Sequence, residues 1–318
     1  MSDRAEEITA FLARTHWADW QQQPMTGDAS ARRYLRLVNG EDSVILMDAP
    51  PGTAGPTEPF VRIAGWLAKQ GLAPPVIHAH DPALGLMLLS DLGPVHFAQE
   101  LQAGNAQLER ERYLAATDVL IHLSRQVPPD GLTRMTPEIG ADMVMMLAHY
   151  APNTDLTVLN DAVRTAMQTY APNPDRVALR DFHAENLIWQ PQAKGLTRVG
   201  LLDFQDAFIA PDGYDLASLL RDARRDVSKT TRQAVLARYA EATGADATFQ
   251  TRLAVLGVQR NLRILGIFAR LAAQDGKRRY LAFLPRVWRH ILDDLSDPAL
   301  RPLKDAVLAT LPAPEAHG

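Results

Sequence analysis

The sequence changes character once along its length, and this change limits the folds open to it. Up to about residue 93, short apolar or alternating runs are separated by glycine and proline, a pattern typical of strands and turns. Beyond that point, apolar residues recur at helical spacing in long segments. One β-like stretch, residues 176–207, interrupts them. We therefore predict an α+β fold with two lobes, residues 1–93 and residues 94–318.

The first lobe is predicted to be small and rich in β-structure. An amphipathic helix over residues 3–14 is followed by ARRYLRLV, the turn Asn39-Gly40 and SVILMD, which together predict a hairpin. Six proline and glycine residues between positions 50 and 59 predict a loop. A helix closed by Gly71 and two strands, PVIHAH and LGLMLLSDLG, complete the lobe.

The second lobe is predicted to be mainly helical. Its apolar residues fall on one face of each predicted helix. The predicted helices cover residues 108–126, 137–150, 155–170, 214–223, 229–242 and 248–273.

Composition excludes several classes of function. The chain of 318 residues has no cysteine, a net charge of −4 and no block of basic residues, which argues against cysteine-ligated metals and dedicated nucleic-acid binding. No apolar run approaches the ~20 residues that span a bilayer, and the acidic start is unlike a secretory signal. We expect a cytoplasmic protein that acts on a small polar molecule, with no membrane association and no obligate protein partner.

Two polar motifs in the β-like stretch indicate the chemistry. LRDFHAENLIW contains Asp181 and, five positions later, Asn186, and VGLLDFQD places Asp203 directly after an apolar strand. A strand pair would bring the three side chains to one cleft. Phosphoryl transfer needs a carboxylate that accepts the proton of the attacking hydroxyl, and hard oxygen ligands for Mg²⁺. We assign Asp181 the first role, and Asn186 and Asp203 the metal.

RDFHAEN followed by LLDFQD resembles the catalytic loop and metal-binding segment of the aminoglycoside phosphotransferase and choline kinase superfamily. The resemblance covers nearly the whole chain and implies a bilobal protein-kinase-like fold, with ATP and Mg²⁺ as cofactors. In such a fold, residues 1–93 would cover the nucleotide, and residues 94–318 would hold the catalytic loop, the metal site and the acceptor pocket. One departure is visible, because the family usually has a histidine two positions before the catalytic aspartate and this chain has Leu179.

A narrower resemblance concerns the substrate. GDASARRYLRL, VILMDAPP, LLSDLG, LLDFQDAFIAPDGYDLASLLRDAR and QRNLRILGIFARL are similar to bacterial anomeric kinases of cell-wall amino sugars. This implies phosphorylation of the C1 hydroxyl of N-acetylmuramate, N-acetylglucosamine or both, in peptidoglycan recycling. The candidate substrate-binding residues are His183, Gln205, Asp206, Arg260, Asn261 and Arg263. His183 could equally brace its loop, and Asp206 could equally be a solvated charge.

The first lobe departs from the family at one position. The strand that normally carries a lysine to the nucleotide phosphates reads VILMDAPP, with Met47 and Asp48 where that lysine is expected. Another cation must replace it in a working kinase, and Arg32 and Arg33 are the nearest candidates. The full set of predicted nucleotide-binding residues is Gly27, Ser30, Arg32, Arg33, Ser90, Asp91 and Leu92.

Two alternatives remain open at this point. The acceptor could be an aminoglycoside, choline or homoserine in place of an amino sugar. The absent lysine also allows a nucleotide-binding module without catalysis, although such a module has no need of Asp181, Asn186 and Asp203 together. Asp215 is expected to cap a helix or to tether the catalytic loop.

Overall fold

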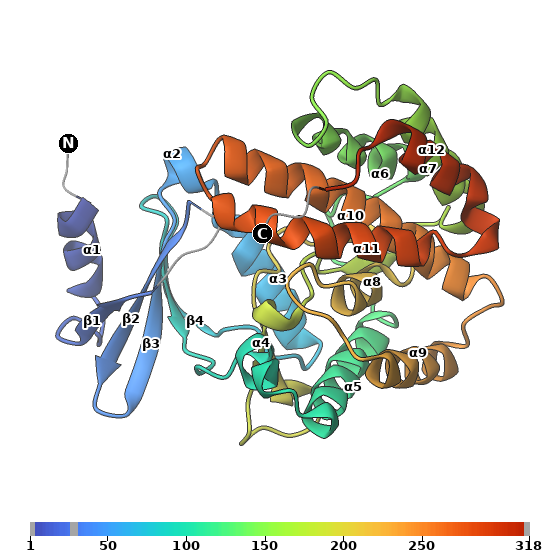
Figure 1. Cartoon of the computed structure of the whole chain (residues 1–318). Coiled ribbons are helices and arrows are strands. Elements are labelled where there is room, and N and C mark those ends of the chain that lie inside the picture. The colour runs from blue at the N-terminus through green and yellow to red at the C-terminus, as the bar shows by residue number, and fades with distance from the viewer. Residues whose placement is uncertain (1–3, 26–30, 315–318) are drawn as a thin grey trace. The chain divides into compact units, whose positions relative to one another are not determined.

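The computed structural model describes residues 4–25 and 31–314 (Figure 1). Contacts within the chain define two compact units. Unit 1 comprises Met1–Val95 and Ile188–Asp206, and unit 2 comprises His96–Leu187 and Ala207–Gly318. Residues 188–206, which the sequence placed in the second lobe, thus group with unit 1. The nucleotide-covering and catalytic roles of the two lobes stay predictions.

Unit 1 is built on one antiparallel sheet. Its five strands lie in the order β1 (Gln21–Pro24), β2 (Arg33–Asn39), β3 (Asp42–Asp48), β5 (Leu86–Ser90) and β4 (Ile77–Asp81). The predicted hairpin is β2–β3, and Gly40 in its turn has φ 62°, a backbone conformation that glycine adopts without strain. The sequence QQQP lacks an apolar alternation, and β1 was therefore not predicted.

Two helices lie on opposite sides of this sheet (Figure 1). On one side, α1 (Arg4–Leu12) packs Phe11 and Leu12 against side chains of β2, β3 and β5. On the other lies α3 (Glu58–Lys69), with Ile63 and Leu67 fully buried. The short α2 (Pro51–Ala54) lies within the predicted loop.

A second hairpin lies in unit 1 except for its first residue, Leu187. It consists of β7 (Leu187–Trp189) and β8 (Val199–Leu201), joined through η4 (Gly195–Arg198). The Leu201 N–H donates to the Ala73 carbonyl over 2.9 Å, and the Trp189 N–H donates to the Val95 carbonyl over 2.8 Å. These backbone bonds attach the hairpin to the segments that follow α3 and β5.

Unit 2 is mainly helical, as predicted. The predicted helices are α5 (Ala106–Leu123), α6 (Pro137–Val144), α7 (Thr157–Tyr170), α8 (Tyr214–Leu220), α9 (Lys229–Thr243) and α10 (Phe249–Ala273). Strand β6 (Arg176–Ala178) pairs with β9 (Phe208–Ala210). Elements that the sequence did not predict are α4 (Phe97–Glu100), η1 (Leu101–Ala103), η3 (Ala184–Asn186), η5 (Arg278–Phe283), α11 (Leu284–Asp294), η6 (Pro298–Leu300) and α12 (Arg301–Thr310).

The single helix predicted over residues 137–150 was wrong in its second part. The chain continues from α6 as a 3₁₀ helix, η2 (Met145–His149). A Cβ atom on Gly266 of α10 would lie 2.2 Å from the Met146 backbone, so the two backbones approach more closely than any side chain allows. Packing against α10 thus accompanies the change of helix type.

The core of unit 2 surrounds α10. Residues buried there come from α6, α7, α8, α10, α11 and α12, and they form one continuous apolar cluster. Since α10 contacts so many neighbours, polar side chains on it are held in fixed positions. Among residues 4–25 and 31–314, no helix has the length and apolar character needed to cross a membrane.

Candidate active site

The catalytic loop of unit 2 runs from the end of β6 to η3. Its shape depends on Asp215 in the first turn of α8, whose carboxylate accepts hydrogen bonds from the N–H groups of Leu179 at 2.5 Å and Arg180 at 3.0 Å. Arg180 has φ 76°, a conformation that costs an ordinary residue free energy and needs support from its surroundings. Asp215 thus tethers the loop directly before Asp181.

Burial raises the pKa of Asp215 to about 7, against the lowering effect of the hydrogen bonds from Leu179 and Arg180. Both carboxylate oxygens accept a backbone N–H, and this geometry suits the ionised form. The tether therefore combines a costly buried carboxylate with two backbone groups that would otherwise be unsatisfied.

The side chain of Asp181 is partly accessible, with 33% of its surface exposed. Arg260 of α10 donates a hydrogen bond to its carboxylate over 3.3 Å. Burial by itself would raise the pKa of Asp181. Positive charge opposes burial and lowers that pKa below its ordinary value; at neutral pH the charges come from Arg260, Arg180 and Arg263. Asp181 is thus ionised at neutral pH and able to accept a proton.

Asn186 and His183 complete the loop. The Asn186 side-chain N–H donates to the Asp181 carbonyl over 2.9 Å and lies 3.4 Å from the His183 ring nitrogen Nε2. This orientation uses the amide nitrogen of Asn186 inside the loop and leaves the amide oxygen uninvolved in that bond. Oxygen is the kind of ligand atom that Mg²⁺ prefers, and metal binding by Asn186 stays a prediction. Burial lowers the pKa of His183, which favours a neutral ring that braces the loop. Its contact with substrate stays a prediction.

The predicted acceptor residues on α10 differ in accessibility. Arg260 is 5% exposed and Asn261 is fully buried, whereas Arg263 is half-buried. Burial lowers the pKa of Arg263, although a guanidinium keeps its charge at physiological pH. Arg263 is thus the most accessible of the three, and substrate contacts by this group stay predictions.

The second motif, which carries Asp203, lies in unit 1. Asp203 and Asp206 are exposed. Phe204 between them is fully buried and packs against Phe60 of α3, with ring centroids 4.9 Å apart and the rings tilted by 35°. The buried Gln205 side-chain amide donates to the Asp203 carboxylate over 2.7 Å, so Gln205 orients this carboxylate. The structure thus presents Asp203 to solvent on an anchored segment.

Asp203 also has a positive φ, 56°. Of the non-glycine residues with positive φ in the described part of the chain, Arg180 and Asp203 fall in the two predicted motifs and Asn153 does not. Backbone strain of this kind concentrates at functional sites. Because Asp181 and Asn186 lie in unit 2 and Asp203 in unit 1, their convergence on one metal ion stays a prediction.

The oxygen donors of this set suit Mg²⁺, which takes one or two carboxylates together with phosphate oxygens and waters. Within residues 4–25 and 31–314, no three or more His, Cys, Asp and Glu side chains gather in a way that could hold a metal ion.

The predicted nucleotide-binding residues of unit 1 are placed as follows. Gly27 and Ser30 lie outside the described residues. Arg33 pairs with Asp48 at 2.6 Å, and Arg32 precedes β2. The structure assigns no nucleotide contact to these residues, and their roles stay predictions.

The predicted nucleotide-binding segment of residues 90–92 already uses several of its polar groups. The Ser90 hydroxyl accepts from the Val76 N–H over 2.8 Å. Asp91 accepts from Arg36 at 2.6 Å and from the Ser43 hydroxyl at 2.9 Å, and the Leu92 side chain lies beside Gly200. The side chains of Ser90 and Asp91 therefore shape the segment, and nucleotide binding by Ser90, Asp91 and Leu92 stays a prediction.

Sequence reasoning missed several residues that support the site. His96 Nδ1 lies 2.8 Å from the Glu185 carbonyl, and the Glu185 carboxylate pairs with Arg224 at 3.2 Å. The predicted site residues did not include Arg180, although it lies inside the RDFHAEN motif, and they did not include Tyr34. A motif search shows none of these contacts, because each joins segments distant in sequence or depends on which way a side chain points.

A known protein family and several characterised kinases are similar to this chain. The profile of the phosphotransferase enzyme family matches residues 21–251. The chain belongs to this family. It is 38% identical over 95% of both chains to the N-acetylmuramate/N-acetylglucosamine kinase of Caulobacter vibrioides, and 34% identical to that of Pseudomonas aeruginosa over 84% of this chain and 82% of the relative.

Solved structures of family members share the fold. The type VIII aminoglycoside-3'-phosphotransferase matches with a TM-score of 0.58 and 15% identity over 83% of this chain and 100% of its own. The choline kinase LicA of Streptococcus pneumoniae matches with a TM-score of 0.63 and 13% identity over 87% of this chain and 93% of its own. These structures confirm the predicted α+β, protein-kinase-like fold. The family match and the two relatives confirm the predicted superfamily and show that the chain is a small-molecule kinase.

Proposed function

We propose that this kinase transfers the γ-phosphoryl group of ATP to the C1 hydroxyl of N-acetylmuramate, N-acetylglucosamine or both. Support comes from the full-length similarity to kinases named for these two sugars. The phosphoryl-transfer chemistry is supported by the state of Asp181, a partly exposed carboxylate with a lowered pKa in a tethered loop. The product would enter peptidoglycan recycling, and a cytoplasmic location would give access to ATP.

The proposed mechanism gives each site residue one role. Asp181 accepts the proton of the sugar hydroxyl as the oxygen attacks the γ-phosphorus, and the β–γ bridging oxygen leaves with ADP. The anomeric hydroxyl is more acidic than an ordinary alcohol, so a carboxylate with a lowered pKa suffices. No covalent enzyme intermediate is required, and positioning of the two reactants supplies much of the acceleration.

Asn186 and Asp203 would hold Mg²⁺ through their side-chain oxygens. The bound ion would neutralise charge on the β- and γ-phosphates. The hydrogen bond from Gln205 keeps the Asp203 carboxylate in one orientation, and the loop bond of Asn186 does the same for its amide. These bonds support the proposal, because both predicted ligands are held before any ion arrives.

Acceptor choice is proposed to depend on the arginines near Asp181. Arg260 donates to Asp181, whereas Arg263 is more accessible and its positive charge also reaches Asp181. An arginine at this place suits the lactyl carboxylate of N-acetylmuramate, a group that N-acetylglucosamine lacks. Arg263→Ala should therefore raise KM for N-acetylmuramate more than KM for N-acetylglucosamine.

The experiment is a product analysis with purified protein, ATP and Mg²⁺. Acceptors are the two amino sugars, an aminoglycoside, choline and homoserine, and ³¹P NMR identifies the phosphorylated atom. A sugar 1-phosphate supports the proposal, and a phosphate on another acceptor assigns the alternative substrate. Retained ATP binding without turnover on any acceptor would instead indicate a nucleotide-binding module.

Two substitutions test the assigned roles. Asp181→Asn should abolish turnover with ATP affinity nearly unchanged, because the amide cannot accept the proton. Asp203→Ala should remove turnover together with the dependence on Mg²⁺. Wild-type kcat in Asp181→Asn would contradict the role of the base.

A further inference from the structure

The end of β3 lacks the lysine expected in this family. Met47 is fully buried, and the antiparallel register places it opposite Tyr34 on β2 and Met87 on β5. The next residue, Asp48, lies opposite Arg33. Alternate residues of a strand point to opposite faces of the sheet, so Met47 with Tyr34 and Asp48 with Arg33 belong to different faces.

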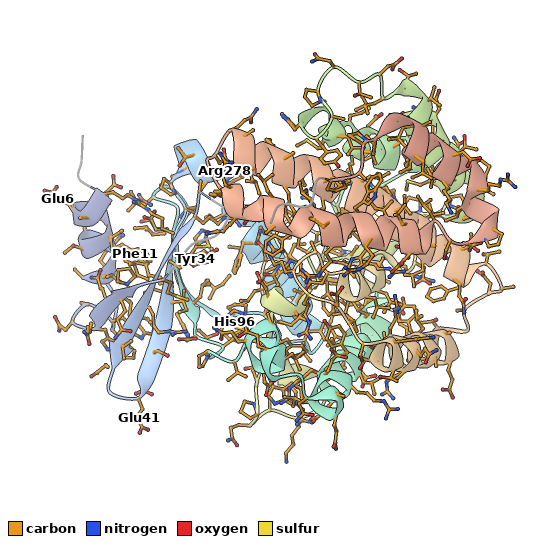
Figure 2. All side chains as sticks on the ribbon, viewed as in Figure 1. Glu6, Phe11, Tyr34, Glu41, His96 and Arg278 are labelled. Atoms are coloured by element: carbon orange, nitrogen blue, oxygen red, sulfur yellow. The ribbon has the colours of Figure 1, made fainter. Side chains whose placement is uncertain are left out.

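The face of Asp48 is the one that α1 covers. Leu35, Leu37, Val44 and Leu46 share the strand parity of Arg33 and Asp48, and all four belong to the apolar cluster with Phe11 and Leu12 of α1. Tyr34 therefore lies on the opposite face. In Figure 2, Phe11 lies between α1 and the sheet, and Tyr34 lies on the other side of the strands.

Arg33 is engaged in a structural ion-pair network on the α1 face. Its guanidinium donates to Asp48 over 2.6 Å. Arg4 of α1 donates to the other oxygen of the same carboxylate over 2.6 Å and also to the Leu84 carbonyl over 2.7 Å. The Asp48 side chain is only 3% exposed, and a buried carboxylate needs such partners. Arg33 and Arg4 thus neutralise Asp48 and fix α1 to the sheet.

On the opposite face, the charges of Arg32 and Asp203 act on Tyr34. Burial raises the pKa of Tyr34; the positive charge of Arg32 and a hydrogen bond from it lower that pKa, and the negative charge of Asp203 raises it. All three residues belong to unit 1. Arg32 precedes Tyr34 by two positions and so has the strand parity of the face that lacks the lysine. The charge of the exposed carboxylate proposed to bind Mg²⁺ reaches the same tyrosine.

We propose that Arg32, held by Tyr34, supplies the positive charge on the nucleotide phosphates that the absent lysine supplies in other family members, and that Arg33 serves only to stabilise unit 1. The inference rests on the proposed kinase function. A guanidinium stays charged at all physiological pH values and can donate two parallel hydrogen bonds to a phosphate. Tyr34 acts as a positioning residue, because it shares a hydrogen bond with Arg32.

The test separates phosphate binding from catalysis. Isothermal titration calorimetry measures the affinities for ADP and for adenosine with EDTA present, so that the difference between them reports the phosphates without a metal. Arg32→Ala should weaken ADP binding by about 10- to 100-fold, the usual effect of one lost charge-assisted contact, and leave adenosine binding unchanged. Arg32→Lys should recover part of the loss, which excludes misfolding as its cause.

Three further variants distinguish the role of Arg32 from the effects of its neighbours and of surface charge. Tyr34→Phe should weaken ADP binding less than Arg32→Ala, again without an effect on adenosine. Arg33→Ala should lower the thermal midpoint, because Asp48 loses a partner, while the loss of ADP affinity stays below that of Arg32→Ala. Arg14→Ala is the charge-matched control, since Arg14 pairs with Asp81 and its side chain is 63% exposed.

Equal ADP affinity in Arg32→Ala and wild type would overturn the inference, as would a larger phosphate-specific loss in Arg33→Ala. Failure of the wild type to bind ADP would overturn both the inference and the proposed function. If wild-type protein binds ADP but phosphorylates no amino sugar, the proposed acceptor is wrong, and the Arg32 titrations still decide the role of Arg32.

Discussion

The tether between Asp215 and the catalytic loop gives the sharpest test of the site. Asp215 is 5% exposed and accepts the backbone N–H groups of Leu179 and Arg180. Replacement by alanine removes both acceptors and leaves two backbone donors unsatisfied at a buried position. Replacement by asparagine keeps one acceptor oxygen and turns an amide N–H toward the second donor.

The magnitude follows from the cost of an unsatisfied buried donor, about 1–3 kcal/mol each. Asp215→Ala should lower the free energy of unfolding by about 2–6 kcal/mol, and Asp215→Asn by about 1–3 kcal/mol. Without the tether, Arg180 is free to leave its φ of 76°, and Asp181 moves with it. A displacement of about 1 Å at a reacting group can cost about 100-fold in rate, so kcat should fall by that order.

Three measurements check this prediction. Urea unfolding gives the free energy of unfolding, steady-state kinetics give kcat, and hydrogen exchange reports the amides of Leu179 and Arg180. Asp297→Asn is the matched control, because Asp297 also accepts a backbone N–H, from Ala299 over 3.0 Å, in the segment before α12. This control should lose very little of its free energy of unfolding, because asparagine and aspartate cap a helix about equally well, and it should keep its kcat.

The reasoning is refuted by a specific combination of results. If Asp215→Asn unfolds within about 0.5 kcal/mol of wild type, keeps kcat within about twofold and shows unchanged exchange at both loop amides, the carboxylate does not hold the loop.

The other predictions concern stability. Asn105 caps α5 by accepting two backbone N–H groups, so Asn105→Ala should cost about 1 kcal/mol in urea unfolding and Asn105→Asp very little. Gly266→Ala should cost about 3 kcal/mol or more, because the added Cβ meets the Met146 backbone; a smaller loss would show that α10 can shift. Burial raises the pKa of Asp294 to about 7, so the folded state binds a proton that the unfolded chain has already released. The free energy of unfolding should therefore fall as pH rises from about 4 to about 7, by up to about 1.4 kcal/mol per pH unit, and Asp294→Asn should flatten this slope.

Local sequence pattern determined much of this protein. The Asn39-Gly40 turn between two apolar runs was sufficient to predict β2–β3, and the spacing of apolar residues was sufficient to predict α7, α9 and α10. Both signals act over a few residues, since a turn or an amphipathic face depends on neighbours in sequence. The motifs with Asp181, Asn186 and Asp203 also identified the superfamily, which the family match confirms.

Only the tertiary structure decided which partners these residues have. Asp215 reaches the loop from 35 and 36 positions away, and Arg260 reaches Asp181 from 79 positions away. No local pattern specifies such pairs, because they depend on how α8 and α10 pack. The same reason applies to Arg32 and Arg33, which are adjacent in sequence and equivalent in composition. Strand pairing and the packing of α1 place Arg33 against Asp48 and leave Arg32 beside Tyr34, so the fold gives two identical side chains different surroundings.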